Sequence, residues 1–355
     1  MKMKHTFIEV PRFVKVKEEL LNELSKLCEE FSFKEIFFLS GRTTYKMLGK
    51  SVEEALATDY VVQRSIIENS NISTFEKLKT EMEQREFDLV VGVGGGKIAN
   101  IGKLLASEAS IPYIYIPTTA SNDGIASPIA TLWDRGRPRS LSARAPTAIL
   151  IDIEAIKKSP RRLLNAGVGD LISNTVANKD WISGHEKKGE DFNEVASALA
   201  VIPVELILSR ASTFDLGKDE DLMLLIRGLI LSGMAMAMHG SSRPASGASH
   251  KFSHAIDLLN LGRGYHGEQV GIGAILMEHL YEKYHDSGNP NAVRSLLKRI
   301  GAPTALAGIG VSGKDFLKIA AKIREIRPYR YTILEDLNLG KKELLQAARE
   351  SGIIK

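Results

Sequence analysis

The sequence predicts an α/β domain with a doubly wound, Rossmann-like parallel sheet, followed by an all-α domain. Short apolar runs alternate with amphipathic stretches up to about residue 155, the pattern of strands separated by helices. From Pro160 onward the apolar residues recur at helical spacing, and no strand-like run follows Ile153. We therefore expect an α/β domain over 1–159 and a helical domain over 160–355.

Four apolar runs are the strand candidates of the first domain. They lie at 35–39, 88–93, 113–117 and 148–152. Helical patterns at 75–86 and 98–107 separate them, as the crossovers of a parallel sheet require.

Long segments of helical periodicity fill the second domain. They are predicted at 163–182, 190–209, 222–238 and 271–285. The run 222–238 is the longest apolar stretch, but it carries Arg227 and is shorter than the roughly 20 residues that a membrane span needs. It therefore predicts a buried core helix.

Composition narrows the class of protein. The chain has 355 residues and a net charge of +4, with the two signs interspersed, which suits a small anionic ligand and is no nucleic-acid footprint. Cys28 is the single cysteine, so neither an intrachain disulfide nor a thiolate metal cluster can form. The basic start Met1–Thr6 is not followed by a secretory signal pattern. We expect a cytoplasmic protein without nucleic-acid partners or membrane insertion.

A glycine-rich turn follows the second predicted strand. Gly94, Gly95 and Gly96 precede Lys97 and Ile98 at the expected start of a helix. Glycines permit close backbone approach, and a helix N-terminus offers N–H groups to a phosphate. The spacing loosely matches a dinucleotide fingerprint, whereas isoleucine after the lysine argues against a nucleoside-triphosphate loop, which needs Ser or Thr there. A tight turn without a ligand is the alternative.

A second loop, 118–128, follows the strand that ends at Pro117. It is rich in hydroxyl-bearing and small residues and includes Asp123. It is placed at the carboxyl end of a parallel strand, where open α/β sheets bind ligands. Two such loops favour a nucleotide site, although ordinary turn chemistry explains either loop alone.

Histidines crowd into the helical half. The chain has 8 histidines, and His250, His254 and His266 lie close together in the sequence. With Asp170 they offer one carboxylate and two imidazoles with a fourth position open, the pattern of a catalytic zinc site. His254 follows His250 by one helical turn and is either a ligand or a proton donor. The alternative is that Asp170 is a helix cap and the histidines lie on the surface.

The order of these motifs predicts a dinucleotide-binding domain over 1–159, a helical metal- and substrate-binding domain over 160–355, and an active site in the cleft between them. Together the motifs resemble the metal-dependent polyol dehydrogenases related to glycerol dehydrogenase and dehydroquinate synthase, and within them the archaeal sn-glycerol-1-phosphate dehydrogenases. The motifs are Gly94–Lys97, Thr118–Pro128, Gly167–Asp170 and Arg243–His250. The likeness spans nearly the whole chain. Dehydroquinate synthases use glutamate at the first ligand, so Asp170 favours the dehydrogenase branch; Ser249 departs from relatives that often have glutamate there.

The resemblance implies roles for individual residues. Metal ligands would be Asp170, His250 and His266. Substrate contacts would be Asp123, Asp170 and His254. Cofactor contacts would be Gly94, Gly95, Gly96, Lys97, Ile98, Thr118, Thr119, Ala120, Ser121 and Ser127. The implied cofactors are NAD(H) or NADP(H) and one divalent metal, zinc being expected.

The resemblance also implies a reaction: NAD(P)H-dependent, reversible reduction of dihydroxyacetone phosphate to sn-glycerol 1-phosphate, for the backbone of archaeal phospholipids. A bound metal would polarise the carbonyl and stabilise the alkoxide. Lys251, Arg243 and Arg263 lie near the ligands in sequence and are candidates for the substrate phosphate, although a solvated surface position is the commoner fate of such residues.

Several alternatives remain open at the level of sequence. They are a polyol dehydrogenase acting on an unphosphorylated substrate, a dehydroquinate-synthase-like lyase, a non-haem iron oxygenase and a nucleotide-binding sensor without metal. Glu68 would favour NAD through a ribose hydroxyl, whereas Arg42 or Arg64 would favour NADP. A homo-oligomer is expected, of a size that the sequence does not specify.

Overall fold

The chain folds into two compact units in the computed structural model, which describes residues 8–16 and 20–355. The first unit contains the chain up to Ala120 together with Gly124–Pro160. The second contains Ser121–Asp123 and Arg161–Lys355. The sequence interpretation of Met1–Thr6 lies outside the described residues.

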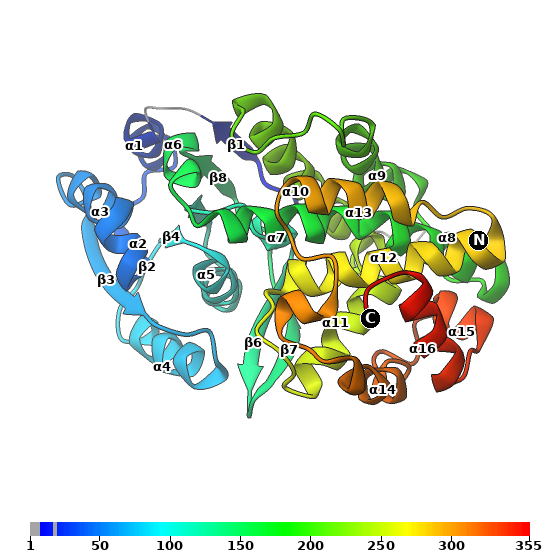
Figure 1. Ribbon diagram of the computed structural model, residues 1–355. Coiled ribbons are helices and arrows are strands. Elements are labelled where there is room, and N and C mark those ends of the chain that lie inside the picture. The colour runs from blue at the N-terminus through cyan, green and yellow to red at the C-terminus, as the bar shows by residue number, and fades with distance from the viewer. Residues whose placement is uncertain (1–7, 17–19) are drawn as a thin grey trace. The chain divides into compact units, whose positions relative to one another are not determined.

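A six-stranded parallel sheet forms the centre of the first unit (Figure 1), in the order β1-β8-β5-β4-β2-β3. The strands are β1 (Phe13–Val16), β2 (Glu35–Gly41), β3 (Val61–Ile67), β4 (Leu89–Gly94), β5 (Tyr113–Pro117) and β8 (Ala148–Ile151). Each ladder in this sheet is parallel. The predicted fold class is confirmed.

The four predicted strands are β2, β4, β5 and β8, which are buried almost throughout. The two edge strands, β1 and β3, were not among them. Residues of β3 alternate irregularly between exposed and partly buried positions, so the strand has no continuous apolar run.

The strand order reverses between β2 and β4. The chain passes from β2 outward to β3 and then returns to β4 on the other side of β2. In open α/β sheets this reversal is where the carboxyl ends of neighbouring strands leave room for a ligand. Ser40–Gly41 and Val93–Gly94 stand at those two ends.

Helices and one hairpin complete the first unit. The helices are α1 (Leu20–Glu30), α2 (Arg42–Thr44), α3 (Lys50–Leu56), α4 (Ile72–Glu83), α5 (Gly96–Ala109) and α6 (Ile153–Lys157). The hairpin pairs β6 (Ile129–Asp134) with β7 (Arg137–Ser142) in antiparallel register. Arg135 and Gly136 connect the strands with positive φ, the two-residue turn that matches strand twist. The hairpin was not predicted.

The second unit is helical throughout its described residues. Its helices are α7 (Arg161–Ile172), α8 (Asn174–Lys188), α9 (Glu194–Ser209), α10 (Asp219–His239), α11 (Ala248–Leu258), α12 (His266–His285), α13 (Pro290–Arg299), α14 (Gly313–Lys322), α15 (Ile333–Leu337) and α16 (Lys341–Glu350). The prediction of one helix over 163–182 was wrong, because the chain breaks at Ser173. The Ser173 hydroxyl donates to the Asp170 carbonyl at 2.7 Å and competes with the helical backbone pattern.

Helix α10 contains the longest apolar run of the chain. Among the described helices it alone is long and apolar enough to cross a membrane by composition, yet 61% of its apolar window is buried inside the protein. It packs against α9 and α7. This is the environment of a core helix.

Candidate active site

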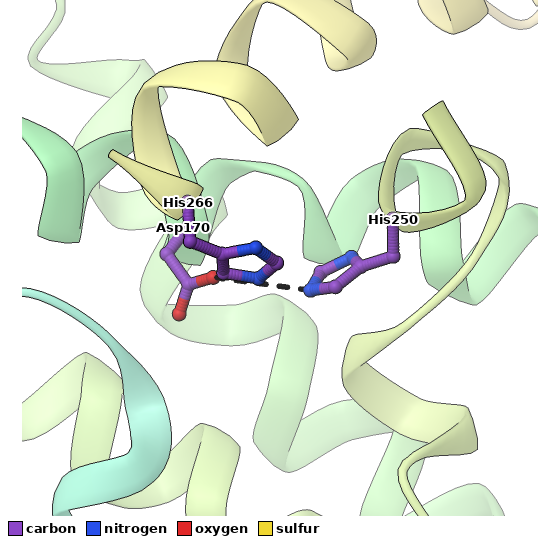
Figure 2. A group of neighbouring side chains, drawn as sticks. All are labelled: Asp170, His250 and His266. Carbon is purple, nitrogen blue, oxygen red and sulfur yellow. Dashed lines mark ion pairs between the residues drawn. The ribbon is translucent and has the colours of Figure 1, made fainter. Parts of the chain in front are cut away.

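Three ligand atoms from three helices converge in the second unit (Figure 2). Asp170 Oδ1 lies 3.8 Å from His250 Nε2 and 3.6 Å from His266 Nε2. All three atoms lie within 4.8 Å of one another. Ligand atoms on a tetrahedral zinc ion are about 3.3 Å apart, so the group is close to the spacing that a metal needs.

Contact between backbones of α7 and α12 brings Asp170 and His266 together. A Cβ placed on Gly169 would collide with the Gly267 carbonyl, and one on Gly267 would collide with the backbone of Ala166. A Cβ on Gly271 would lie 3.2 Å from the Gly169 Cα. Glycines on both helices therefore permit an approach that side chains would prevent. Asp170 and His266 stand beside this crossing.

His266 is held in one tautomer by a relay of hydrogen bonds. The Ser253 hydroxyl lies 3.0 Å from His266 Nδ1 and donates to Gln269 Oε1 at 2.6 Å. Because the Ser253 hydroxyl proton is used in the bond to Gln269, the Ser253 oxygen accepts from His266 Nδ1–H. The lone pair of His266 Nε2 then faces Asp170. Gln269 in turn donates to Asp257 at 3.0 Å. Such outer contacts orient imidazole ligands in metal sites.

His250 reaches the group from α11 and is buried. Its Nδ1 has no hydrogen-bond partner within the described chain. Burial, followed by the neighbouring histidines, lowers the pKa of His250 well below its usual value. Desolvation also lowers the pKa of His266, to about 4. Both imidazoles are therefore neutral near pH 7, the form that binds metals.

Asp170 is a buried carboxyl beside a second one. Burial and then the charge of Asp123 raise the pKa of Asp170 well above its usual value. The Asp123 backbone N–H donates to Asp170 Oδ2 at 3.0 Å, and the Ser232 hydroxyl donates to Asp123 Oδ2 at 2.9 Å. Two neighbouring carboxyls with two neutral imidazoles would be stabilised by a divalent cation, so the donor set fits a metal.

His254 lies next to the three ligand atoms without joining them. Its ring centroid is 6.3 Å from that of His250 and 5.7 Å from that of His266. Burial lowers its pKa well below the usual value. The alternative that Asp170 caps a helix is wrong, because Asp170 lies inside α7. The alternative of a partly exposed surface position is wrong for His250, which is buried, whereas His254 is half-buried.

The glycine turn joins β4 to α5 in the first unit. Gly95 is the N-cap of α5 and supplies no capping side chain. A Cβ on Gly94 would collide with Ile98 and lie 3.2 Å from Thr44 Oγ1. The turn therefore leaves backbone N–H groups at the start of a helix, at the strand reversal, where a pyrophosphate would bind. Sequence reasoning missed Thr44, which follows the neighbouring strand.

Thr118 and Thr119 adjoin this turn. The Thr118 N–H donates to the Gly94 carbonyl at 3.0 Å. A Cβ on Gly95 would lie 3.2 Å from Thr119 Cγ2, and Thr119 Oγ1 is buried without a partner in the described chain. An unsatisfied buried hydroxyl at a phosphate-type turn fits a polar cofactor. Ala120 is buried beside them, and Ser121 belongs to the second unit.

Lys103 holds the segment that contains Ser127, a role that sequence reasoning missed. Its ammonium is buried and donates to the carbonyls of Gly124 (2.9 Å), Ser127 (3.1 Å) and Ile129. A lysine buried inside a helix pattern is indistinguishable in sequence from an exposed one, so no signal marked it.

Charged residues near the turn form exposed pairs. Arg42 contacts Glu68 at 2.6 Å, and Lys97 donates to the Glu68 carbonyl at 2.9 Å. Arg64 pairs with Glu53 at 3.1 Å. Both a carboxylate and a guanidinium thus lie at the end of β3.

Two of the three residues suggested for the substrate phosphate have other partners. Lys251 is buried and pairs with Glu335 at 2.8 Å, and buried Arg243 pairs with Glu190 at 2.7 Å. The expectation of a solvated surface position was wrong for both. Arg263 is exposed.

Curated proteins similar to this chain are glycerol-1-phosphate dehydrogenases. The protein of that name from Archaeoglobus fulgidus is 38% identical over 351 residues, covering 99% of this chain and 100% of the relative. The one from Pyrococcus furiosus is 38% identical, over 98% of this chain and 99% of the relative. The family model described as iron-containing alcohol dehydrogenase matches residues 15–160.

Solved structures with the same fold are more distant in sequence. A probable glycerol dehydrogenase from Sinorhizobium meliloti has a TM-score of 0.80 at 19% identity, with 98% of each chain covered. Maleylacetate reductase from a Rhizobium strain has a TM-score of 0.74 at 17% identity, again with 98% of each chain covered.

Proposed function

Because this chain belongs to the glycerol-1-phosphate dehydrogenase family, we propose that it catalyses the NAD(P)H-dependent, reversible reduction of dihydroxyacetone phosphate to sn-glycerol 1-phosphate. The observation that carries the proposal is the convergence of Asp170, His250 and His266 in a chain that matches these dehydrogenases from end to end. The product would be the backbone of archaeal phospholipids.

Asp170, His250 and His266 would hold one divalent metal, which we propose is zinc. When bound, the metal would supply Lewis-acid polarisation of the substrate carbonyl. Three protein ligands leave a fourth position open, as catalytic sites require. The Ser253–Gln269 pair keeps His266 Nε2 available, and the glycine crossing of α7 and α12 fixes its distance from Asp170.

Asp123 and His254 would contact the substrate, as would Asp170. Asp123 is oriented by Ser232 and lies against Asp170. His254 is neutral because burial lowers its pKa, so it can pass a proton to the forming hydroxyl only after receiving one from solvent or a neighbour. Both residues would position the substrate carbonyl and the hydroxyl group on the neighbouring carbon.

The domain over 1–159 would bind the dinucleotide, and that over 160–355 the metal and substrate. The free N–H groups of Gly95, Gly96 and Lys97 would receive the pyrophosphate, with Gly94 and Ile98 shaping the turn. The rest of the cofactor site would be lined by Thr118, Thr119, Ala120, Ser121 and Ser127. Reduced nicotinamide would supply the hydride, with NADH and NADPH both retained as candidates.

The test combines metal analysis with activity. Purified protein is expected to contain about one zinc per chain and to oxidise NADH or NADPH with dihydroxyacetone phosphate, losing activity to a chelator and regaining it with zinc. The product should be inert to an sn-glycerol-3-phosphate dehydrogenase. Faster turnover of unphosphorylated dihydroxyacetone would instead identify a polyol dehydrogenase, and an absence of net NADH oxidation would exclude the redox proposal.

We also propose a cytoplasmic homo-oligomer. Helix α9 exposes Val195 (59%), Ile202 (50%) and Leu206 (45%) on one apolar stripe. In a two-fold dimer the same patch on a second copy can cover this one, because two-fold interfaces are self-complementary. Light scattering should give a mass above that of one chain, and Ile202→Asp should lower it. A monomeric wild-type protein would contradict the proposal.

A further inference from the structure

Two arginines, the half-buried Arg327 and the buried Arg330, lie on the segment after α14. Arg330 is buried, with a relative exposure of 7%. Its guanidinium donates to the Ser246 carbonyl at 2.6 Å and to the Ser242 hydroxyl at 3.2 Å. Arg327 donates to the Ser246 hydroxyl at 2.7 Å and approaches that of Ser242 at 3.5 Å. The two guanidiniums thus share two serines.

The charge of Arg330 is poorly compensated. Arg330 forms no ion pair with any carboxylate in the part of the chain that the structure describes, whereas neighbouring Arg243 pairs with Glu190 at 2.7 Å. Burial, then the charges of Arg327 and Arg243, lower the pKa of Arg330 to about 9. The group therefore remains a cation near pH 7. Burying a cation without an anion is costly, so the cluster is suited to receive one.

The cluster adjoins the candidate metal site. Ser246 precedes α11, the helix that carries His250 and His254, by two residues. Burial is the main cause of the lowered pKa of His250, His254 and His266, and the charge of Arg327 adds to it, so the Arg327 guanidinium lies within electrostatic reach of all three imidazoles. Arg327 also has a φ of 45°, a left-handed conformation uncommon for arginine. Such backbone is retained where the surroundings impose it, often at ligand sites.

We propose that Arg327, Arg330 and the hydroxyls of Ser242 and Ser246 bind the phosphate monoester of the substrate. The inference rests on the proposed function for the identity of that substrate. Two guanidiniums balance a phosphate dianion, and their forked donors match phosphate oxygens. Two serine hydroxyls on the segment that leads into the metal-ligand helix would fix the phosphate relative to the carbonyl. This cluster takes the role that the sequence suggested for Lys251 or Arg243.

The first test compares substrates with and without phosphate. Arg327→Gln should raise the KM for dihydroxyacetone phosphate about 100-fold. The loss in kcat/KM should be at least about 30-fold larger with dihydroxyacetone phosphate than with dihydroxyacetone, which lacks the phosphate. Arg327→Lys keeps the positive charge but loses the paired N–H donors of the guanidinium, so its KM for dihydroxyacetone phosphate should lie between those of wild type and Arg327→Gln. The matched control is Lys322→Gln, which removes one positive charge from the end of α14, just before that segment, where Lys322 pairs with Glu325 at 2.8 Å. This variant should behave as wild type.

The second test uses inorganic phosphate and needs no turnover. Calorimetry should detect phosphate binding to the wild type and to Lys322→Gln, and a loss of at least about tenfold in Arg327→Gln and Ser246→Ala. The serine variant covers the case in which Arg327→Gln does not fold. Unchanged phosphate affinity in both variants, or equal losses with the two substrates, would overturn the inference. A wild type that binds phosphate through Arg327 yet reduces neither ketone would overturn only the proposed function.

Discussion

The glycine turn of the first unit and the histidine group of the second are built in opposite ways. The turn Gly94–Ile98 is one contiguous segment whose backbone provides the donors. The group Asp170, His250 and His266 uses side chains from three helices. A contiguous motif depends on local sterics, whereas the dispersed group depends on how helices pack. Substitutions should therefore separate cofactor binding from metal binding.

The largest effect is expected from His250→Ala. It removes one of three ligands, so the metal should be lost and activity should fall at least about 1000-fold. Elemental analysis measures the metal content. Fluorescence measures NADH binding, which should remain near that of wild type. Turnover close to wild type in a metal-free variant would contradict the ligand assignment.

His254→Ala sharpens the comparison within the second unit. Its ring lies beside the ligands but outside the group, so metal content should be retained while kcat falls about 100-fold. Elemental analysis and steady-state kinetics measure the two effects. Loss of metal equal to that of His250→Ala would make His254 a ligand.

Gly94→Ala tests the first unit. The added Cβ collides with Ile98, so the turn must shift and the KM for the dinucleotide should rise about tenfold, while metal content stays unchanged. Gly313→Ala is the control, since a Cβ there meets nothing within 4 Å. Unaltered cofactor kinetics in Gly94→Ala would remove the turn from the proposed cofactor site.

The smallest effect is expected from Ser253→Ala. It removes the acceptor for His266 Nδ1–H without touching the ligand atoms, so zinc affinity should fall about tenfold. Competition with a chromophoric chelator measures this affinity. Ser209→Ala, which alters an exposed serine bonded to the Leu206 carbonyl, should leave the affinity unchanged. A wild-type zinc affinity in Ser253→Ala would show that the Ser253 hydrogen bonds do not support metal binding.

Sequence patterns predicted the buried half of the sheet better than its edges. The runs that became β2, β4, β5 and β8 are continuous because both faces of those strands are covered. Edge strand β3 lacks such a run, and the break at Ser173 depends on a side-chain hydrogen bond that periodicity does not reveal.

At the site, the sequence predicted the candidate ligand residues but not the residues that surround them. Asp170, His250 and His266 carry recognisable chemistry, so they could be proposed before their convergence was known. Ser253, Gln269 and Arg330 act through burial and contacts between distant segments. Serine, glutamine and arginine are common, and nothing in their local sequence distinguishes these three from surface residues.

The glycine crossing of α7 and α12 would also link the proposed metal binding to folding. Asp170 and His266 are far apart in the chain and meet only after those helices dock, so the complete site exists only in the folded second unit. A ligand that binds only the native state raises the free energy of unfolding by mass action, by about 2.7 kcal/mol at a free concentration 100 times its Kd. Thermal stability of the helical unit should therefore follow metal supply, with the Gly169–Gly267 contact determining whether any metal can bind.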